Sequence, residues 1–128
     1  MAQRPYRQVT LIGKSLGTLS LGYLLTTQTL PLHARSIWLT PLIQSEKLRQ
    51  QIQRGRHPSL FVIGTADPYY NVTYLAEIQA ATGSEIMTIE GADHSLNIEN
   101  NVLQSIQALE QVMRAIETFL ADMGKAEK

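Results

Sequence analysis

Three residues whose side chains could do chemistry together are spread along the chain, each in a segment that contains glycine. Ser15 lies in "GKSLG", Asp67 in "GTADP" and His94 in "GADHS". A histidine titrates near neutral pH, so its ring can take the hydroxyl proton of a serine and return it to a leaving group. A buried carboxylate can orient that ring and stabilise its protonated form. These residue types therefore predict nucleophilic catalysis by Ser15.

Each of the three residues follows a short apolar run that predicts a β-strand, and a further strand lies between the first two. The four runs are "QVTLI" (8–12), "RSIWLT" (35–40), "SLFVIG" (59–64) and "SEIMTIE" (84–90). Helical patterns separate and follow them at 16–27, 44–54, 71–81 and 99–123. We expect one α/β domain over residues 1–128, a three-layer αβα fold whose mainly parallel sheet has about four strands.

A parallel sheet brings the carboxyl ends of its strands to one edge, which is where ligands bind in such folds. Ser15, Asp67 and His94 would therefore meet at that edge. The flanking residues Gly13 and Gly17 permit a tight turn and a close approach between strand and helix. The N–H of Leu16 would begin the next helix and could donate a hydrogen bond to an oxyanion.

Each candidate also has a structural alternative. Ser15 could cap the helix that follows it, and Asp67 could shape a turn before Pro68. Asp93 is a second carboxylate near His94, but as its neighbour in the same loop it is poorly placed to orient the ring. His94 itself could be an ordinary surface residue.

Several other polar or aromatic residues are interpreted as structural. We interpret Lys14 as a solvated or helix-packed cation, and His33 and His57 as loop residues. Three tyrosines shortly after Asp67 could line a substrate pocket, although packing is the simpler role; they are Tyr69, Tyr70 and Tyr74.

The composition argues against several function classes. Lys plus Arg and Asp plus Glu both number 11, so the net charge is zero, whereas nucleic-acid and membrane-surface binding normally need a basic excess. The chain has no cysteine, and its three histidines are scattered, so we expect no metal and no cofactor. "MAQRPYRQ" lacks the apolar core of a signal peptide, and no run reaches transmembrane length, so we expect a cytoplasmic protein.

The motifs together resemble the α/β-hydrolase family, specifically its C-terminal half. "VTLIGKSLG" resembles the nucleophile strand and elbow, "PSLFVIGTADPYYN" the acid strand, and "IEGADHSL" the histidine loop. The resemblance implies Ser15 as nucleophile, Asp67 as acid and His94 as base, with Leu16 N–H as an oxyanion donor and Gly13 and Gly17 as elbow glycines. Family members usually have a strand-rich N-terminal half whose loop gives the second oxyanion donor. Only seven residues precede "QVTLI", so we expect a truncated domain.

Two function hypotheses follow. The first is a serine hydrolase of the esterase type that acts on a small ester or related acyl compound. The second is a hydrolase-derived binding or assembly module with a weak or inactive triad. In both, strand 8–12 would be a bare apolar edge, so we expect a homo-oligomer or a partner chain that covers it.

Overall fold

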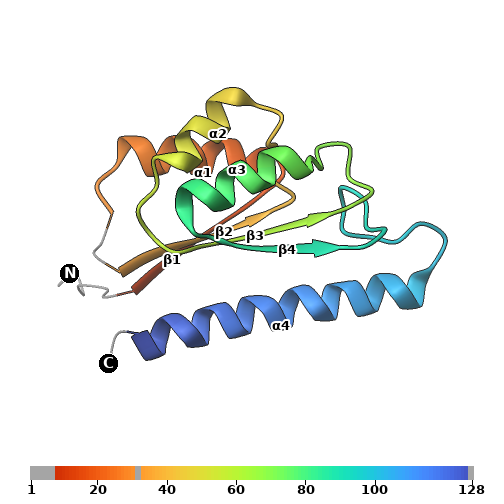
Figure 1. Cartoon of the computed structure of the whole chain (residues 1–128). Coiled ribbons are helices and arrows are strands. Elements are labelled where there is room, and N and C mark those ends of the chain that lie inside the picture. The colour runs from red at the N-terminus through yellow and green to blue at the C-terminus, as the bar shows by residue number, and fades with distance from the viewer. Residues whose placement is uncertain (1–7, 31–32, 127–128) are drawn as a thin grey trace, which may run out of the picture.

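A four-stranded parallel sheet forms the centre of the protein. The computed structural model describes residues 8–30 and 33–126. The strands lie side by side in the order β1-β2-β3-β4, all parallel (Figure 1). Their bounds are β1 Gln8–Lys14, β2 His33–Leu39, β3 Ser59–Gly64 and β4 Glu85–Ile89. The predicted parallel sheet of four strands is confirmed, with ends shifted by one or two residues.

Four helices lie in two layers around this sheet. They are α1 Leu16–Thr27, α2 Glu46–Gln53, α3 Val72–Thr82 and α4 Val102–Ala126. Figure 1 shows α1, α2 and α3 on one face of the sheet and α4 alone on the other. This is the αβα arrangement expected from the alternation of strands and helices.

Each face of the sheet has its own hydrophobic core. On the face of α1–α3, the rings of Trp38 and Phe61 stack with centroids 5.4 Å apart. On the face of α4, Val62 of β3 packs with Val112 and Phe119 of the helix. Alternate side chains of β3 enter opposite cores, as the continuous apolar run "SLFVIG" predicts for a strand covered on both faces.

Helix α4 departs from expectation at both ends. It begins at Val102 rather than near residue 99, because Asn100 takes a positive φ of 60° and the Asn101 side chain caps the helix by accepting a hydrogen bond from the Gln104 N–H. It continues through Gly124 to Ala126 instead of ending near residue 123. Glycine lowers helix stability by about 1 kcal/mol relative to alanine but does not forbid the helix.

Helix α1 is less covered than its apolar sequence suggests. The small and apolar residues of this segment predict burial on more than one side, but the buried residues of α1 are Thr18, Leu21 and Gly22 alone. Leu16 is 73% exposed and Tyr23 is 61% exposed. The reason is the position of α1 beside β1, which is one of the two edge strands of the described sheet. Across the described ranges 8–30 and 33–126, no helix is long and apolar enough to cross a membrane.

Candidate active site

The turn between β1 and α1 holds Ser15 in a strained conformation. Its backbone has φ 53° and ψ −118°, a positive φ that is uncommon for a residue with a side chain. A Cβ at Gly13 would lie 2.9 Å from the carbonyl oxygen of Gly17, so glycine is needed where strand and helix approach. The Ser15 N–H donates to the carbonyl of Leu39 at 3.0 Å. The turn is therefore fixed to the carboxyl end of β2.

The buried side chain of Thr18 holds the same turn in place. The hydroxyl of Thr18 donates to the Ser15 carbonyl oxygen at 2.6 Å and accepts a hydrogen bond from the Leu42 N–H at 3.2 Å. Its side chain thus ties the first turn of α1 to the segment after β2, and it is fully buried. The sequence motifs do not identify this positioning residue. Its one signal is a Thr three residues after Ser15, a spacing that places a hydroxyl near a helix-start carbonyl.

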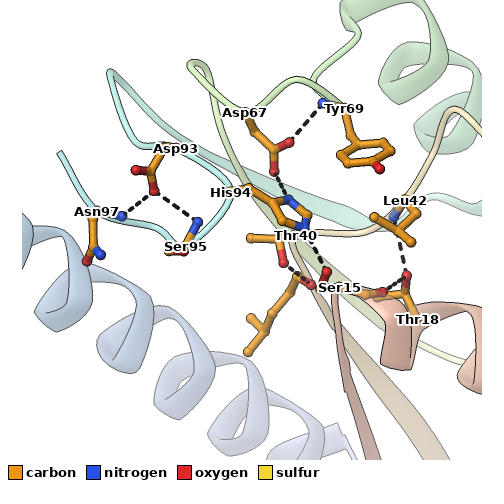
Figure 2. Close-up of polar contacts among 11 residues, drawn as sticks. Ser15, Thr18, Thr40, Leu42, Asp67, Tyr69, Asp93, His94, Ser95 and Asn97 are labelled. Atoms are coloured by element: carbon orange, nitrogen blue, oxygen red, sulfur yellow. Dashed lines mark hydrogen bonds and ion pairs between the residues drawn. The ribbon is translucent and has the colours of Figure 1, made fainter. Parts of the chain in front are cut away.

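Ser15, His94 and Asp67 form one continuous chain of hydrogen bonds (Figure 2). Ser15 Oγ lies 2.6 Å from His94 Nε2, and His94 Nδ1 lies 2.8 Å from a carboxylate oxygen of Asp67. The other carboxylate oxygen accepts a hydrogen bond from the Tyr69 N–H at 2.8 Å. With a proton on Nδ1 facing the carboxylate, Nε2 is free to accept the serine proton. The Ser15 side chain makes no helix-capping hydrogen bond, so the capping alternative is wrong.

Burial differs along this chain of hydrogen bonds. The Asp67 side chain is fully buried, whereas one third of the His94 side chain, 33%, is exposed. A buried carboxylate needs partners for both oxygens, and the Tyr69 N–H and the His94 ring provide them. The Tyr69 ring also lies 5.2 Å from the His94 ring, centroid to centroid, so the imidazole is packed from the side while its Nε2 faces Ser15.

Two loops are packed together to bring Asp67 and His94 into contact. A Cβ at Gly64 would overlap the carbonyl of Ala92, so glycine is required where the loop after β4 crosses the end of β3. The Ala66 N–H donates to that same carbonyl at 2.9 Å, and Thr65 Oγ1 accepts from the Gly91 N–H at 2.8 Å. These bonds fix the separation between the two loops.

Asp93 shapes the loop that carries His94 and does not contact the ring. One of its carboxylate oxygens accepts hydrogen bonds from the Ser95 and Asn97 N–H groups, at 2.9 and 3.0 Å (Figure 2). The carboxylate on the imidazole is that of Asp67. The expectation that Asp93 is poorly placed to orient His94 agrees with this geometry.

The remaining candidates lie outside this cluster. His57 precedes β3, at the opposite end of the strand from Asp67, and contacts Ser36 Oγ at 3.1 Å. Burial lowers the pKa of His57 from its ordinary value. Lys14 is exposed beside the serine turn. His33 is the first residue of β2, so its interpretation as a loop residue is wrong, and its side chain lies outside the described part of the structure. Among the described residues, no group of three or more histidines and carboxylates could hold a metal ion.

The first residue of α1 supplies one donor beside Ser15. The opening N–H groups of a helix have no intrahelical acceptor and carry partial positive charge, so the Leu16 N–H is suited to bind an anion. Gly17 differs from Gly13, because a Cβ at Gly17 would meet nothing within 4 Å. The close approach expected at both glycines is therefore found at Gly13 alone in the described chain.

Three solved structures with a similar fold are described as a hydrolase, an esterase and a bromoperoxidase. A predicted CIB-like hydrolase from Thermoplasma acidophilum matches with a TM-score of 0.62 and 20% identity over 88% of this chain and 50% of that one. A thermophilic esterase from Thermogutta terrifontis, in its propionate-bound form, matches with a TM-score of 0.64 and 17% identity over 90% of this chain and 56% of that one. A bromoperoxidase from Bacillus anthracis matches with a TM-score of 0.62 and 12% identity over 88% of this chain and 67% of that one. No curated protein matches significantly.

At such low identity these structures establish the fold alone, and the chain spans about half of the length of the first of them. The sequence itself gives a more direct comparison. The sequence model of a family described as "Alpha/beta hydrolase domain" matches residues 1–121, which is nearly the whole chain. That match includes the serine turn and the segments that carry Asp67 and His94. The chain therefore belongs to the α/β-hydrolase family, as its motifs predicted.

Proposed function

We propose that the protein is a serine hydrolase that cleaves a small ester or related acyl compound through a Ser15–His94–Asp67 triad. The observation that carries this proposal is the unbroken run of hydrogen bonds from Ser15 Oγ through His94 to Asp67, with Ser15 on a strained turn between strand and helix. A serine hydroxyl is a weak nucleophile until a base removes its proton, and His94 Nε2 lies at hydrogen-bond distance from it.

Each residue has a distinct part in the proposed reaction. Ser15 Oγ attacks the carbonyl carbon of the ester while His94 Nε2 takes the hydroxyl proton. Asp67 keeps the proton of the neutral ring on Nδ1 and stabilises the imidazolium that forms. His94 then gives its proton to the leaving alcohol, which departs as the acyl-enzyme forms. Water, activated by His94, releases the acid and restores the Ser15 hydroxyl.

The Leu16 N–H is the proposed oxyanion donor. It precedes the first hydrogen-bonded turn of α1 and is adjacent to the nucleophile, so an oxyanion formed on the substrate would lie near the positive end of the helix. Removal of one oxyanion donor typically costs about 10²–10³ in turnover. We therefore expect slow turnover when the Leu16 N–H is the sole hydrogen-bond donor to the oxyanion. A partner that provides a second donor should make turnover faster.

Ester hydrolysis by purified protein tests the proposal. Initial rates with p-nitrophenyl acetate and p-nitrophenyl butyrate would be compared for the natural sequence, Ser15→Ala and His94→Ala. The matched control is Ser95→Ala, because Ser95 is an exposed hydroxyl in the histidine loop. We expect Ser15→Ala and His94→Ala to remove hydrolysis and Ser95→Ala to retain it. Equal rates for Ser15→Ala and the natural sequence would refute the proposal.

The alternative candidate is a hydrolase-derived binding or assembly module. The observation that favours it is the apolar surface beside β1, where Ile12 and Leu16 are 58% and 73% exposed. A module would keep the fold and this surface without turnover. If the natural sequence is folded by circular dichroism yet hydrolyses neither ester above the rate of Ser15→Ala, the module becomes the better account.

A further inference from the structure

Tyr69 contacts two residues of the hydrogen-bonded chain through different atoms. Its backbone N–H donates to a carboxylate oxygen of Asp67 at 2.8 Å. Its ring centroid lies 5.2 Å from that of His94, with the two planes tilted by 44° (Figure 2). Because the backbone makes the bond to Asp67, the side chain of Tyr69 can be replaced without removing that hydrogen bond.

The other two tyrosines of this segment differ from Tyr69 in their contacts. The ring of Tyr74 is covered by the Arg49 guanidinium, whose carbon lies 3.7 Å from the ring centroid. Tyr70 packs against the core on the face of α1–α3, and its N–H donates to the Asp67 carbonyl oxygen at 2.9 Å. Tyr69 borders the same core and is in addition the one of the three whose ring contacts His94. Packing therefore accounts for Tyr70 and Tyr74, whereas Tyr69 has a further contact.

The Tyr69 side chain is not sealed inside the core. Ser15, His94 and Tyr69 are all half-buried, so each presents part of its side chain to solvent at the carboxyl end of the sheet. A half-buried aromatic ring keeps apolar surface available for contact with a ligand. The exposed part of Tyr69 therefore borders the place where a substrate would react.

The proposed reaction determines which part of an ester approaches Tyr69. His94 Nε2 lies 2.6 Å from Ser15 Oγ and later protonates the leaving alcohol, so the alcohol oxygen must come within about 3 Å of Nε2. The carbonyl oxygen is directed instead to the Leu16 N–H at the start of α1. The alcohol is thus the part of the substrate that is brought to His94, and the Tyr69 ring lies beside His94.

The ring of Tyr69 favours one class of alcohol over others. Aromatic rings attract each other at centroid distances of about 4.5–7 Å, in tilted or offset arrangements, by more than their buried area alone explains. A flat aryl group on the leaving oxygen can make such a contact. A short alkyl group has neither the surface nor the ring to do so.

We propose that Tyr69 is a specificity-determining residue that contacts the alcohol part of the substrate and selects aryl esters. This inference rests on the proposed hydrolase function, because the alcohol is the leaving group of that reaction. The acyl group stays on Ser15 after the alcohol departs, so the Tyr69 side chain acts in formation of the acyl-enzyme and not in its hydrolysis. It differs in this respect from His94, which transfers protons in both steps.

Rates with aryl and alkyl esters of one acid test this selection. Phenyl acetate would be compared with trifluoroethyl acetate, an activated alkyl ester, and the ratio of natural to variant kcat/KM cancels the intrinsic reactivity of each ester. For Tyr69→Leu we expect a fall of about five- to tenfold with phenyl acetate and of less than about twofold with trifluoroethyl acetate. Tyr69→Phe keeps a ring and should retain both rates within about twofold.

The matched control is Tyr70→Leu, because Tyr70 is the adjacent residue and is equally half-buried. It should lower neither ester's rate selectively. Circular dichroism would verify that each variant is folded. Equal losses with the two esters in folded Tyr69→Leu would overturn the proposal, and so would an aryl-selective loss in Tyr70→Leu of the same size as in Tyr69→Leu.

A second readout separates contact with the alcohol from a role in holding His94. With p-nitrophenyl dimethylcarbamate, release of p-nitrophenol reports transfer of the carbamoyl group to Ser15, and mass spectrometry follows its slow loss. Tyr69→Leu should slow the transfer about five- to tenfold and leave the loss within about twofold of the natural rate. If both steps slowed together, Tyr69 would act by positioning His94, and the proposal would be wrong.

Binding without turnover distinguishes this inference from the proposed function. In the Ser15→Ala background, saturation-transfer NMR would measure binding of phenyl acetate, which Tyr69→Leu should weaken about five- to tenfold and Tyr70→Leu should not. A natural sequence that hydrolyses no ester, together with this binding pattern, would refute the proposed function and keep the aryl contact. Ser15-dependent hydrolysis with no effect of Tyr69→Leu on phenyl acetate would overturn the inference alone. Absence of both hydrolysis and binding would refute both.

Discussion

The loops around Ser15 and the flank formed by β1 and α4 differ in how fully their groups are partnered. In the loops, the Asp67 carboxylate, the His94 ring and the Ser15 hydroxyl are joined by hydrogen bonds of 2.6–2.8 Å. On the flank, a row of apolar side chains on α4 remains more than half exposed. The chain thus positions its candidate catalytic groups with its own loops, while leaving a large apolar surface without a described partner.

This contrast indicates that the geometry of the Ser15, His94 and Asp67 side chains is set by contacts within the chain, independently of what covers the sheet. The hydroxyl of Thr18 and the absence of a Cβ at Gly64 fix the serine turn and the two loops, and both lie within the described chain. Neither depends on what covers α4. We therefore expect substitutions in the loops to change catalysis, and substitutions on the flank to change association.

The largest expected effect concerns the carboxylate on His94. Asp67→Asn would present an amide to His94 Nδ1 and favour the wrong tautomer, so kcat for p-nitrophenyl acetate should fall about 10⁴-fold. Asp93→Asn is the matched control, because its amide oxygen can still accept from the Ser95 and Asn97 N–H groups. We expect a fall of about tenfold or less there, equivalent to ~1.4 kcal/mol. Similar losses in both variants would contradict the assigned roles.

The second prediction compares how much the free energy of unfolding changes when a buried and an exposed apolar side chain are each replaced by alanine. Phe61 is fully buried and stacks on Trp38, so Phe61→Ala should lower the free energy of unfolding by about 3–5 kcal/mol. Leu109 is 56% exposed on α4, so Leu109→Ala should change it by about 0.5 kcal/mol or less. Urea denaturation measures both. A large loss at Leu109 in a monomeric sample would show that its side chain is already buried.

The third prediction separates the two glycines of the serine turn. Gly13→Ala would press a methyl group against backbone 2.9 Å away, and we expect a loss of about 1–3 kcal/mol in unfolding free energy. Gly17→Ala meets open space in a helix, so it should leave stability unchanged or raise it by up to about 1 kcal/mol. Urea denaturation of the two variants at one pH gives the comparison. If Gly13→Ala and Gly17→Ala lowered the unfolding free energy equally, the space beside Gly17 would have to be occupied, contrary to this prediction.

The smallest expected effect is a pH dependence of stability at the far end of the sheet. Burial lowers the pKa of His57, so the unfolded chain binds a proton at this site more readily than the folded one. Its contribution to stability is present above the unfolded value near 6.5, is reduced as pH falls below it, and is lost once pH passes the lower folded pKa. The natural sequence should therefore lose more unfolding free energy between pH 7.5 and 5.5 than His57→Gln. An identical loss in both would contradict this.

The sequence predicted the candidate site residues and the strands that carry them, but not the contacts that hold these residues in place. Ser15, Asp67 and His94 could be identified because each follows its own apolar run, and parallel strands bring such positions to one edge. Thr18 and Thr40 could not be identified from such a pattern. Thr18 acts through a contact with the Leu42 N–H, and Thr40 is fully buried with a positive φ of 46° after β2. Such contacts depend on how distant loops pack, which a local pattern does not record.

The exposure of α1 and α4 shows a second limit. An apolar pattern predicts that a helix face will be buried, but it does not identify the partner. The residues Leu16, Tyr23 and Leu109 are apolar as a core helix requires, yet they face solvent in this chain. The apolar pattern on these helices therefore predicts that a face will be covered, but not which surface covers it.

The most direct test of the central claim is covalent capture of the nucleophile. Folded protein would be treated with a fluorophosphonate, which reacts with a serine that an adjacent base activates, and the adduct would be located by mass spectrometry. The account predicts one adduct, on Ser15, which is absent in Ser15→Ala, abolished in His94→Ala and kept in Ser95→Ala. A folded protein that forms no adduct, or forms it on another serine, would contradict the claim that Ser15, His94 and Asp67 act as a triad.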